Sequence, residues 1–281
     1  MSTQTVSTCD IKLHSSTSKN GTIQSPLFPG PYPPRTECKY EFQGNGRQRV
    51  QIKFTEFTLP SSDGDDCEQL DVLLVYMPVK GKYEPVETLC GDTLPKPLMS
   101  NGPRMLLDFR GRHSGKGNRG FKADYVFLEN FGIISGRQIP DYQCSFVYNS
   151  SYETSGWFHS PNFPGAYPRC DEDSSSDSVE FSNFNSVDRK FQKYCSKIPK
   201  GFTVKSDGKF FRITFRSNDR LDGTGFRASY TFEVEKPTTE IPSLAIDNSN
   251  SSSELCTLMK QGNFKTDSRL QILHGSSKEF F

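Results

Sequence analysis

The sequence lacks the features of several large protein classes. No apolar run approaches the ~20 residues that a membrane-spanning helix needs, and no window has the 3.6-residue period of an amphipathic helix. The first residues are neither basic nor apolar, so no signal peptide is visible. A net charge of +1 over 281 residues favours neither nucleic acid nor an acidic partner.

Motifs of catalysis and metal binding are missing as well. The four histidines are scattered, and the chain has no Cys-x-x-Cys, His-Glu-x-x-His or Gly-x-Ser-x-Gly. Residues 115–120 fit Gly-x-Gly-x-x-Gly, but an alternating strand follows them instead of the helix that presents amide groups to a pyrophosphate. We interpret them as a hairpin turn and predict that the chain is not an enzyme.

Two proline-rich stretches organise what is present: SPLFPGPYP at 25–33 and SPNFPGAYP at 160–168, which lie 135 residues apart. Cys9 and Cys144 precede them at the same spacing. Prolines at this density exclude a helix or a central strand, because each removes a backbone donor and fixes φ. A pattern repeated at a fixed offset indicates a duplicated domain.

Short alternating segments fill the region between Cys9 and Leu128. Apolar residues alternate with polar ones at 50–55, 105–109 and 121–127, and residues 70–76 are apolar at most positions. Strands of this kind, separated by Gly, Pro and Asp, predict a β-sandwich.

These residues also resemble a known family. In order along the chain they are Cys9, 25–33, Cys38, 54–57, Cys67 with Asp71, 89–91, 107–109 and 120–125, and together they resemble a CUB domain. The resemblance implies a jelly-roll-like sandwich of two antiparallel sheets with disulfides Cys9–Cys38 and Cys67–Cys90. It also implies a non-catalytic, extracellular, protein-binding module.

A second copy begins at Cys144. Its late part agrees with the first, since 225–232 echo 120–127, but the offset has fallen from 135 to 105 residues. About 30 residues are therefore missing between Pro168 and Cys195, and we expect this copy to lack core strands and to be the less ordered one.

We predict an all-β chain of CUB-type jelly-roll sandwiches, one complete copy plus a second truncated copy. The expected boundaries are an N-terminal extension 1–8, a first CUB domain 9–129, a linker 130–143, a shortened CUB-like domain 144–235 and a disordered tail 236–281. The tail is polar and cannot bury enough apolar surface to offset chain entropy.

The remaining cysteines leave alternatives open. Cys170 could stand for either lost position, and its pairing with Cys195 is favoured; Cys144 is then unpaired or bonded to Cys256. Asn20, Asn149 and Asn250 are N-glycosylation acceptors, which favours an extracellular or cell-surface protein whose export signal and anchor lie outside this chain.

Some CUB domains bind calcium through a Glu before the third cysteine, an Asp after it and an Asp in a late loop. The corresponding candidates are Asp71 in the first copy and Asp177 and Asp219 in the second. Pro60 stands at the expected Glu position, and Asp63, Asp65 and Asp66 are better interpreted as a solvated acidic loop. We predict no cofactor, with calcium as the one candidate.

A basic loop follows the late strand of the first copy. We hypothesise that Arg110, Arg112, Lys116 and Arg119 bind an acidic partner or a sulfated glycan, the alternative being a solvated turn. Trp157 and Phe158, next to the second proline-rich stretch, are expected in the core.

The amino-acid sequence at residues 144–151 and 162–165 is similar to that of the suppressor-of-lurcher and neuropilin-and-tolloid-like group of proteins. Members of that group are transmembrane auxiliary subunits of ligand-gated ion channels at synapses. The resemblance implies recognition of an extracellular or membrane-receptor protein and no nucleic acid. The alternative is a non-catalytic CUB region of a secreted tolloid-like or complement-like protease, which a zinc-binding His motif or a serine triad elsewhere would favour.

Overall fold

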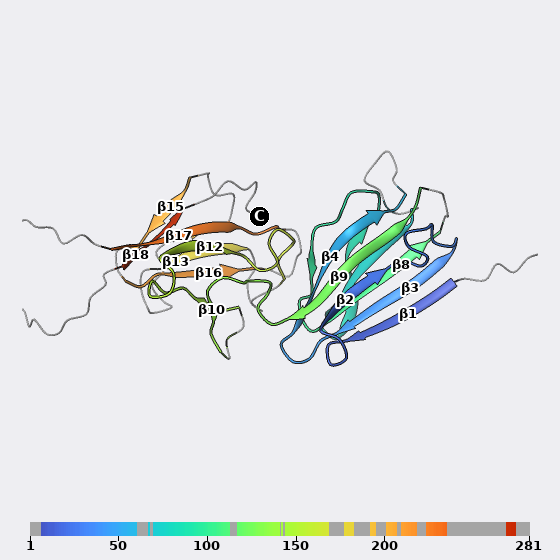
Figure 1. The fold of residues 1–281 in the computed structure, drawn as a ribbon, viewed down its shortest axis with the longest axis horizontal. Helices are drawn as coiled ribbons and strands as arrows, with labels where there is room; N and C mark the ends of the chain where they lie inside the picture. Colours follow the sequence, from blue (N-terminus) through green and yellow to red (C-terminus); the bar gives the residue numbers. More distant parts are fainter. Residues whose placement is uncertain are drawn as a thin grey trace, which may run out of the picture.

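All regular structure in the described part of the chain is β-strand. The computed structural model describes residues 7–60, 67, 70–112, 117–140, 142, 144–168, 177–182, 192–194, 201–206, 209–217, 223–234 and 268–273. Among these residues no helix is long and apolar enough to cross a membrane. The strands form two units that follow one another along the long axis of the molecule (Figure 1).

Within the described residues, the N-terminal unit has nine strands in two sheets, with the orders β1-β3-β8-β5-β6 and β2-β9-β4-β7. All described pairs are antiparallel except β1 with β3. The strands are β1 (Ser7–His14), β2 (Asn20–Gln24), β3 (Thr36–Gln43), β4 (Arg49–Thr58), β5 (Val72–Val79), β6 (Lys82–Leu89), β7 (Leu98–Met99), β8 (Arg104–Gly111) and β9 (Gly120–Leu128).

The period-2 alternation of these strands sends one set of side chains between the sheets. The core includes Tyr40 and Phe42 of β3, Ile52 of β4, Phe109 of β8 and Phe121 of β9, each at most 1% exposed. Edge-to-face contacts join the sheets, with 5.6 Å between the ring centroids of Phe109 and Phe121. The prediction of an all-β, CUB-like jelly roll is therefore confirmed.

The C-terminal unit is built from shorter strands. Its sheets have the orders β12-β17-β18-β15 and β14-β13-β16, and β10 pairs with β11 beside them. The strands are β10 (Arg137–Gln138), β11 (Phe146–Val147), β12 (Ser155–His159), β13 (Ser178–Ser182), β14 (Gln192–Tyr194), β15 (Thr203–Lys205), β16 (Arg212–Arg216), β17 (Arg227–Val234) and β18 (Ser268–Leu273).

The two units share strand register in one sheet. Gly21 of β2 lies opposite Tyr125 of β9, and Gly156 of β12 lies opposite Tyr230 of β17. In both units the next corner is held in the same way, because a serine hydroxyl accepts a hydrogen bond from the backbone N–H at the start of the long strand. The distances are 3.1 Å from Phe121 to Ser25 and 3.0 Å from Phe226 to Ser160.

The register is shared in the second sheet as well. Leu73 of β5 lies opposite Phe109 of β8, and Val179 of β13 lies opposite Phe215 of β16. The tyrosine of each proline-rich stretch packs edge-on against that phenylalanine, at 5.0 Å for Tyr32 and 4.9 Å for Tyr167. β12, β17, β13 and β16 are thus the counterparts of β2, β9, β5 and β8.

Strand β18 is the counterpart of β4, although it lies near the C-terminus. Ile52 of β4 pairs with Tyr125 and Leu98, and Ile272 of β18 pairs with Tyr230 and Val204. The segments also match in sequence, RVQI at 49–52 and RLQI at 269–272. The structure therefore differs here from the disordered tail predicted for 236–281: a short alternating segment forms a strand where a sheet offers it two neighbours.

Two further predictions for the second copy concern the adjacent aromatic residues Trp157 and Phe158 and the pairing of the remaining cysteines. Phe158 is buried in the core, but Trp157 is 45% exposed, so its predicted core position is wrong. Trp157 alternates to the outer face of β12, where the Arg227 guanidinium lies 4.5 Å from its ring centroid. Cys170, Cys195 and Cys256 lie outside the described residues.

Candidate protein-interaction surfaces

The two disulfides of the N-terminal unit join the pairs that the family resemblance implies. Cys9 of β1 and Cys38 of β3 lie side by side in the parallel ladder, with their Cα atoms 4.5 Å apart. Cys67 and Cys90 have Cα atoms 5.9 Å apart and tie the chain before β5 to the end of β6. These links fix the ends of the first sheet.

A buried carboxylate organises the loop end of this unit. Asp71 accepts a hydrogen bond of 2.5 Å from the Tyr32 hydroxyl and one of 2.7 Å from the backbone N–H of Arg112. Burial, and then the hydrogen bond to Asp71, raise the pKa of Tyr32, so its hydroxyl remains a donor. Asp71 therefore ties the proline-rich stretch to the start of the basic loop.

Among the described residues, Asp71 is not joined by the further acidic side chains that a calcium site would need. Both oxygens of Asp71 accept hydrogen bonds, and Pro60 offers no side-chain oxygen. Across the described residues, no three His, Cys, Asp or Glu side chains gather as a metal ion would require. Asp177 accepts from Tyr167 in the same manner, whereas Asp219 and Asp63, Asp65 and Asp66 lie outside the described residues.

The arginines proposed for partner binding have different surroundings. Arg110 donates to Asp108 through Nε and Nη2 at 3.0 and 2.8 Å, and this hydrogen bonding raises the Arg110 pKa. Arg119 donates to Glu56 at 2.9 Å and to the Pro29 carbonyl at 3.3 Å. Arg112 is exposed, and Lys116 lies outside the described residues.

Arg119 brings the basic loop against the first proline-rich stretch. Its guanidinium lies 5.7 Å from the ring centroid of Phe28, and the neighbouring Leu27 is 70% exposed. We call Leu27, Phe28, Arg112 and Arg119 the corner surface. It combines an apolar projection with two exposed or partly exposed cations.

The second proline-rich stretch is used differently, because it contacts the N-terminal unit. Asn162, the counterpart of Leu27, is 1% exposed and accepts a hydrogen bond of 2.7 Å from the Gln51 amide. Its own amide donates to the carbonyls of Pro97 and Ala166 at 2.9 and 2.7 Å. These contacts explain why Gln51, expected on a solvent-facing side of its strand, is buried.

Apolar side chains complete this junction. Met99, Phe131 and Ile133 form a buried cluster against which Cys144 and Phe146 pack. The Arg49 guanidinium lies 4.4 Å from the ring centroid of Phe131. Sequence reasoning missed the junction, and its one signal was the change from Leu27 to Asn162 between otherwise similar stretches.

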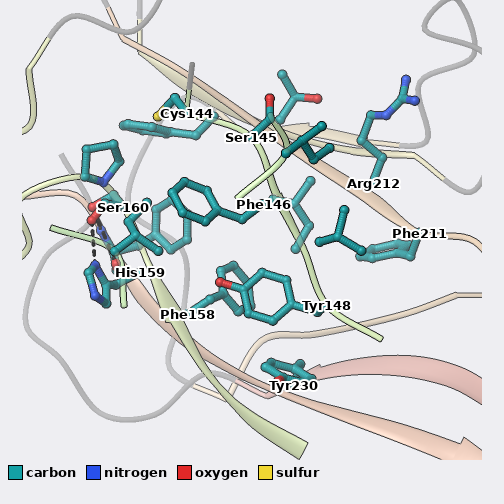
Figure 2. A pocket seen from close by; sticks show the side chains of 18 of the residues that line it. Cys144, Ser145, Phe146, Tyr148, Phe158, His159, Ser160, Phe211, Arg212 and Tyr230 are labelled. Atoms are coloured by element: carbon teal, nitrogen blue, oxygen red, sulfur yellow. Dashed lines mark hydrogen bonds between the residues drawn. The ribbon is translucent and has the colours of Figure 1, made fainter. Parts of the chain in front are cut away.

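A cavity of about 630 Å³ lies inside the C-terminal unit. Its wall is largely aromatic, and Figure 2 shows the rings of Phe146, Tyr148 and Phe158 grouped near Tyr230. Burial raises the pKa of Tyr148, and burial together with a hydrogen bond to Glu153 raises the pKa of Tyr230 to about 12. The cavity therefore presents neutral aromatic rings.

Two of the three predicted glycosylation acceptors, Asn20 and Asn149, are exposed. Asn20 opens β2, and Asn149 lies in a turn where its side-chain Oδ1 accepts a hydrogen bond of 2.8 Å from the Ser151 N–H. Asn250 lies outside the described residues.

Residues 9–125 match the family model described as "CUB domain", which confirms the CUB resemblance for this unit.

Several known proteins are similar to this chain. Human "Tolloid-like protein 2" is 26% identical over 245 residues, covering 78% of this chain and 22% of that protein. Pig "Cubilin" is 26% identical over 247 residues, covering 77% and 6%. A solved structure titled "Crystal structure of the MASP-1 CUB2 domain bound to Ca2+" is 26% identical, with 41% of this chain and 96% of that chain covered and a TM-score of 0.36. The chain thus spans about a fifth or less of the length of these two curated relatives.

Proposed function

We propose that the chain is a non-catalytic, extracellular protein-recognition module made of a CUB domain at 9–129 and a shortened CUB-like domain at 144–235. The observation that carries this proposal is the complete CUB sandwich over 9–125, with its corner surface exposed at the loop end. The region similar to this chain makes up 22% of human "Tolloid-like protein 2" and 6% of pig "Cubilin".

The corner surface is the proposed contact with an acidic partner protein. Leu27 supplies apolar area, and Arg112 and Arg119 supply positive charge that attracts carboxylates. Arg110 and Arg119 already donate to Asp108 and Glu56, so the carboxylates of a partner would share these arginines with the chain's own acidic residues.

We further propose that the partner is a ligand-gated ion channel, with this chain acting as part of an auxiliary subunit. The resemblance of the second copy to the suppressor-of-lurcher and neuropilin-and-tolloid-like group, at residues 144–151 and 162–165, supports this proposal. The alternative, the non-catalytic CUB region of a tolloid-like protease, has the support of the tolloid-like relatives. Sequencing the full transcript distinguishes the two, because a downstream apolar helix favours the first and a zinc-binding His motif favours the second.

Binding of the secreted chain to cells that express a ligand-gated cation channel tests the corner surface. The double variant Arg112→Glu with Arg119→Glu should bind about tenfold more weakly than the unmodified chain. The control is Lys12→Glu with Lys39→Glu, which makes the same charge change on two exposed residues of β1 and β3. Equal binding by the two double variants would show that the corner surface is not the contact.

A further inference from the structure

The outer face of one sheet differs between the two units at matched positions. β12 and β17 of the C-terminal unit lie side by side (Figure 1), as do their counterparts β2 and β9. Trp157 of β12 lies opposite Ser229 of β17. The equivalent pair in the N-terminal unit is Thr22 and Asp124. Side chains alternate between the two faces of a strand, and these four are exposed or partly exposed, so both pairs lie on the outer face.

The N-terminal unit supplies its own negative charge to this face. The Thr22 hydroxyl donates to the Asp124 carboxylate at 2.8 Å. Lys122, the preceding outward residue of β9, places a cation on the same side of the strand. The predicted glycosylation acceptor Asn20 is also on this face, at the start of β2, whereas its counterpart Ser155 is not an acceptor. The face therefore carries charges of both signs and the site of a predicted glycan.

The C-terminal unit has an aromatic ring and a different cation at the same positions. Trp157 stands in the place of Thr22 and is 45% exposed. Arg227 stands in the place of Lys122, and its guanidinium lies 4.5 Å from the Trp157 ring centroid. Packing on the ring reduces the conformational freedom of the guanidinium, so an anion that binds it loses less affinity to side-chain ordering.

The C-terminal unit does not supply the carboxylate at this place. Ser229, which carries no charge, takes the position of Asp124. Within the described part of the chain, Arg227 contacts the Trp157 ring and forms no ion pair. The outward acidic residue of β17, Glu233, is six positions from Arg227, which is about 20 Å along the strand. The face therefore combines a large exposed ring with an adjacent positive charge.

Further aromatic surface continues toward the second proline-rich stretch. His159 lies opposite Arg227, and its ring centroid is 6.2 Å from that of Phe163. We call Trp157, Arg227, His159 and Phe163 the aromatic face. Trp and Arg are the residue types enriched where protein–protein contacts are strongest, whereas small molecules bind in concave sites. The outer face of a sheet with these two residues therefore fits a protein.

We propose that the aromatic face is a second contact with a partner protein, which presents an acidic side chain beside a large apolar one. The apolar side chain packs on the Trp157 indole. The carboxylate binds the Arg227 guanidinium, at the place where Asp124 supplies a carboxylate in the N-terminal unit. The proposal rests on the proposed role in protein recognition, but not on the corner surface or on an ion channel as the partner.

Panning a phage library of random peptides on the full chain tests the proposal. Clones that also bind the variant Trp157→Thr are removed, because this variant carries the residue that the N-terminal unit has at that position. The remaining clones should be enriched, and their peptides should share an Asp or Glu next to a large apolar residue. Synthetic copies should bind Arg227→Gln about tenfold more weakly than the unmodified chain in fluorescence anisotropy.

Substitutions at Ser229 separate charge from shape. Ser229→Asp restores the carboxylate that Asp124 provides in the N-terminal unit, so it should occupy Arg227 and weaken peptide binding about tenfold. Ser229→Asn adds a side chain of nearly the same size as Asp without the charge, and peptide binding should not change. Lys122→Gln, the equivalent of Arg227→Gln in the other unit, should also leave binding unchanged. Thermal unfolding followed by circular dichroism establishes that all variants fold.

Four results would overturn the proposal. The first is no enrichment after subtraction, and the second is enriched peptides without an acidic residue. The third is equal weakening by Ser229→Asp and Ser229→Asn. The fourth is saturable quenching of Trp157 fluorescence by 3′-sialyllactose that Arg227→Gln abolishes, because the occupant would then be an acidic glycan. The double variant Arg112→Glu with Arg119→Glu should still bind these peptides, so failure of the corner surface and failure of the aromatic face are distinguishable.

Discussion

Replacement of Asn162 should weaken the junction between the units much more than the equivalent change at Leu27. Asn162→Gly removes three side-chain hydrogen bonds, a buried one to Gln51 and partly buried ones to the carbonyls of Pro97 and Ala166. Each contributes about 1 kcal/mol net, and the buried Gln51 amide loses its partner, so the expected loss is about 3 kcal/mol. Leu27→Gly should cost well under 1 kcal/mol, because Leu27 is largely exposed.

The comparison is matched in backbone conformation. Leu27 and Asn162 have φ values of 59° and 58°, so glycine relieves the same left-handed backbone at both sites. Urea unfolding followed by fluorescence of Trp157, the single tryptophan, reports on the C-terminal unit. Equal losses for the two variants would refute the assignment of Asn162 as the polar anchor of the junction.

Three further predictions concern stability. Burial raises the pKa values of Tyr40 and Tyr230, to about 12 for Tyr230, whereas tyrosine in the unfolded chain ionises near pH 10. The contribution of these neutral tyrosines to the free energy of unfolding should therefore be fully present below about pH 10 and should decrease as the pH rises toward 12. Tyr40→Phe loses the 2.6 Å hydrogen bond to the Gln24 carbonyl and should lower the free energy of unfolding by about 1 kcal/mol at neutral pH. In urea titrations the variant should also lose less stability than the unmodified chain as the pH rises above 10. An equal loss in both proteins would contradict a raised Tyr40 pKa as the cause. Replacing Cys9 and Cys38 by alanine opens a link of sequence separation 29 and should lower the free energy of unfolding by about 3–4 kcal/mol in calorimetry, whereas a loss below about 1 kcal/mol would argue against the bond. Removing residues 268–281 should destabilise the C-terminal unit while removing 274–281 should not, as judged by Trp157 fluorescence on heating; the same midpoint for both truncations would exclude β18 as a structural strand.

The N-terminal unit was predictable because its information is local. Alternation at 50–55, 105–109 and 121–127 indicated strands in the expected places, and these strands pair in a CUB-like sandwich. Gln51 was the exception in this pattern, since its burial depends on Asn162, which is 111 residues away. Contacts between the two units do not follow the alternation of polar and apolar residues along a strand, so this alternation does not predict them.

The C-terminal unit was less predictable because two of its features, strand β18 and the cavity, arise where strands of the N-terminal unit have no counterpart at the equivalent place in the sequence. The segment RLQI is too short to identify as a strand inside a polar tail, and its role becomes visible only through its pairing with β17 and β15. The cavity likewise arises from the space between strands. Trp157 was misassigned because alternation from the buried Phe158 places it outward, a constraint that the neighbouring proline-rich stretch does not override.

A single gap in the sequence of the second copy affects both of its sheets. β3 and β4 follow each other along the chain but belong to different sheets, each lying between two other strands. The described residues of the second unit contain no strand between β12 and β13, so one continuous omission removes an inner strand from each sheet. The retained ladders keep their register because Tyr167, Phe215 and Phe226 still join the sheets through edge-on contacts. Within the described residues, β18 restores the inner strand of one sheet, where it lies between β17 and β15.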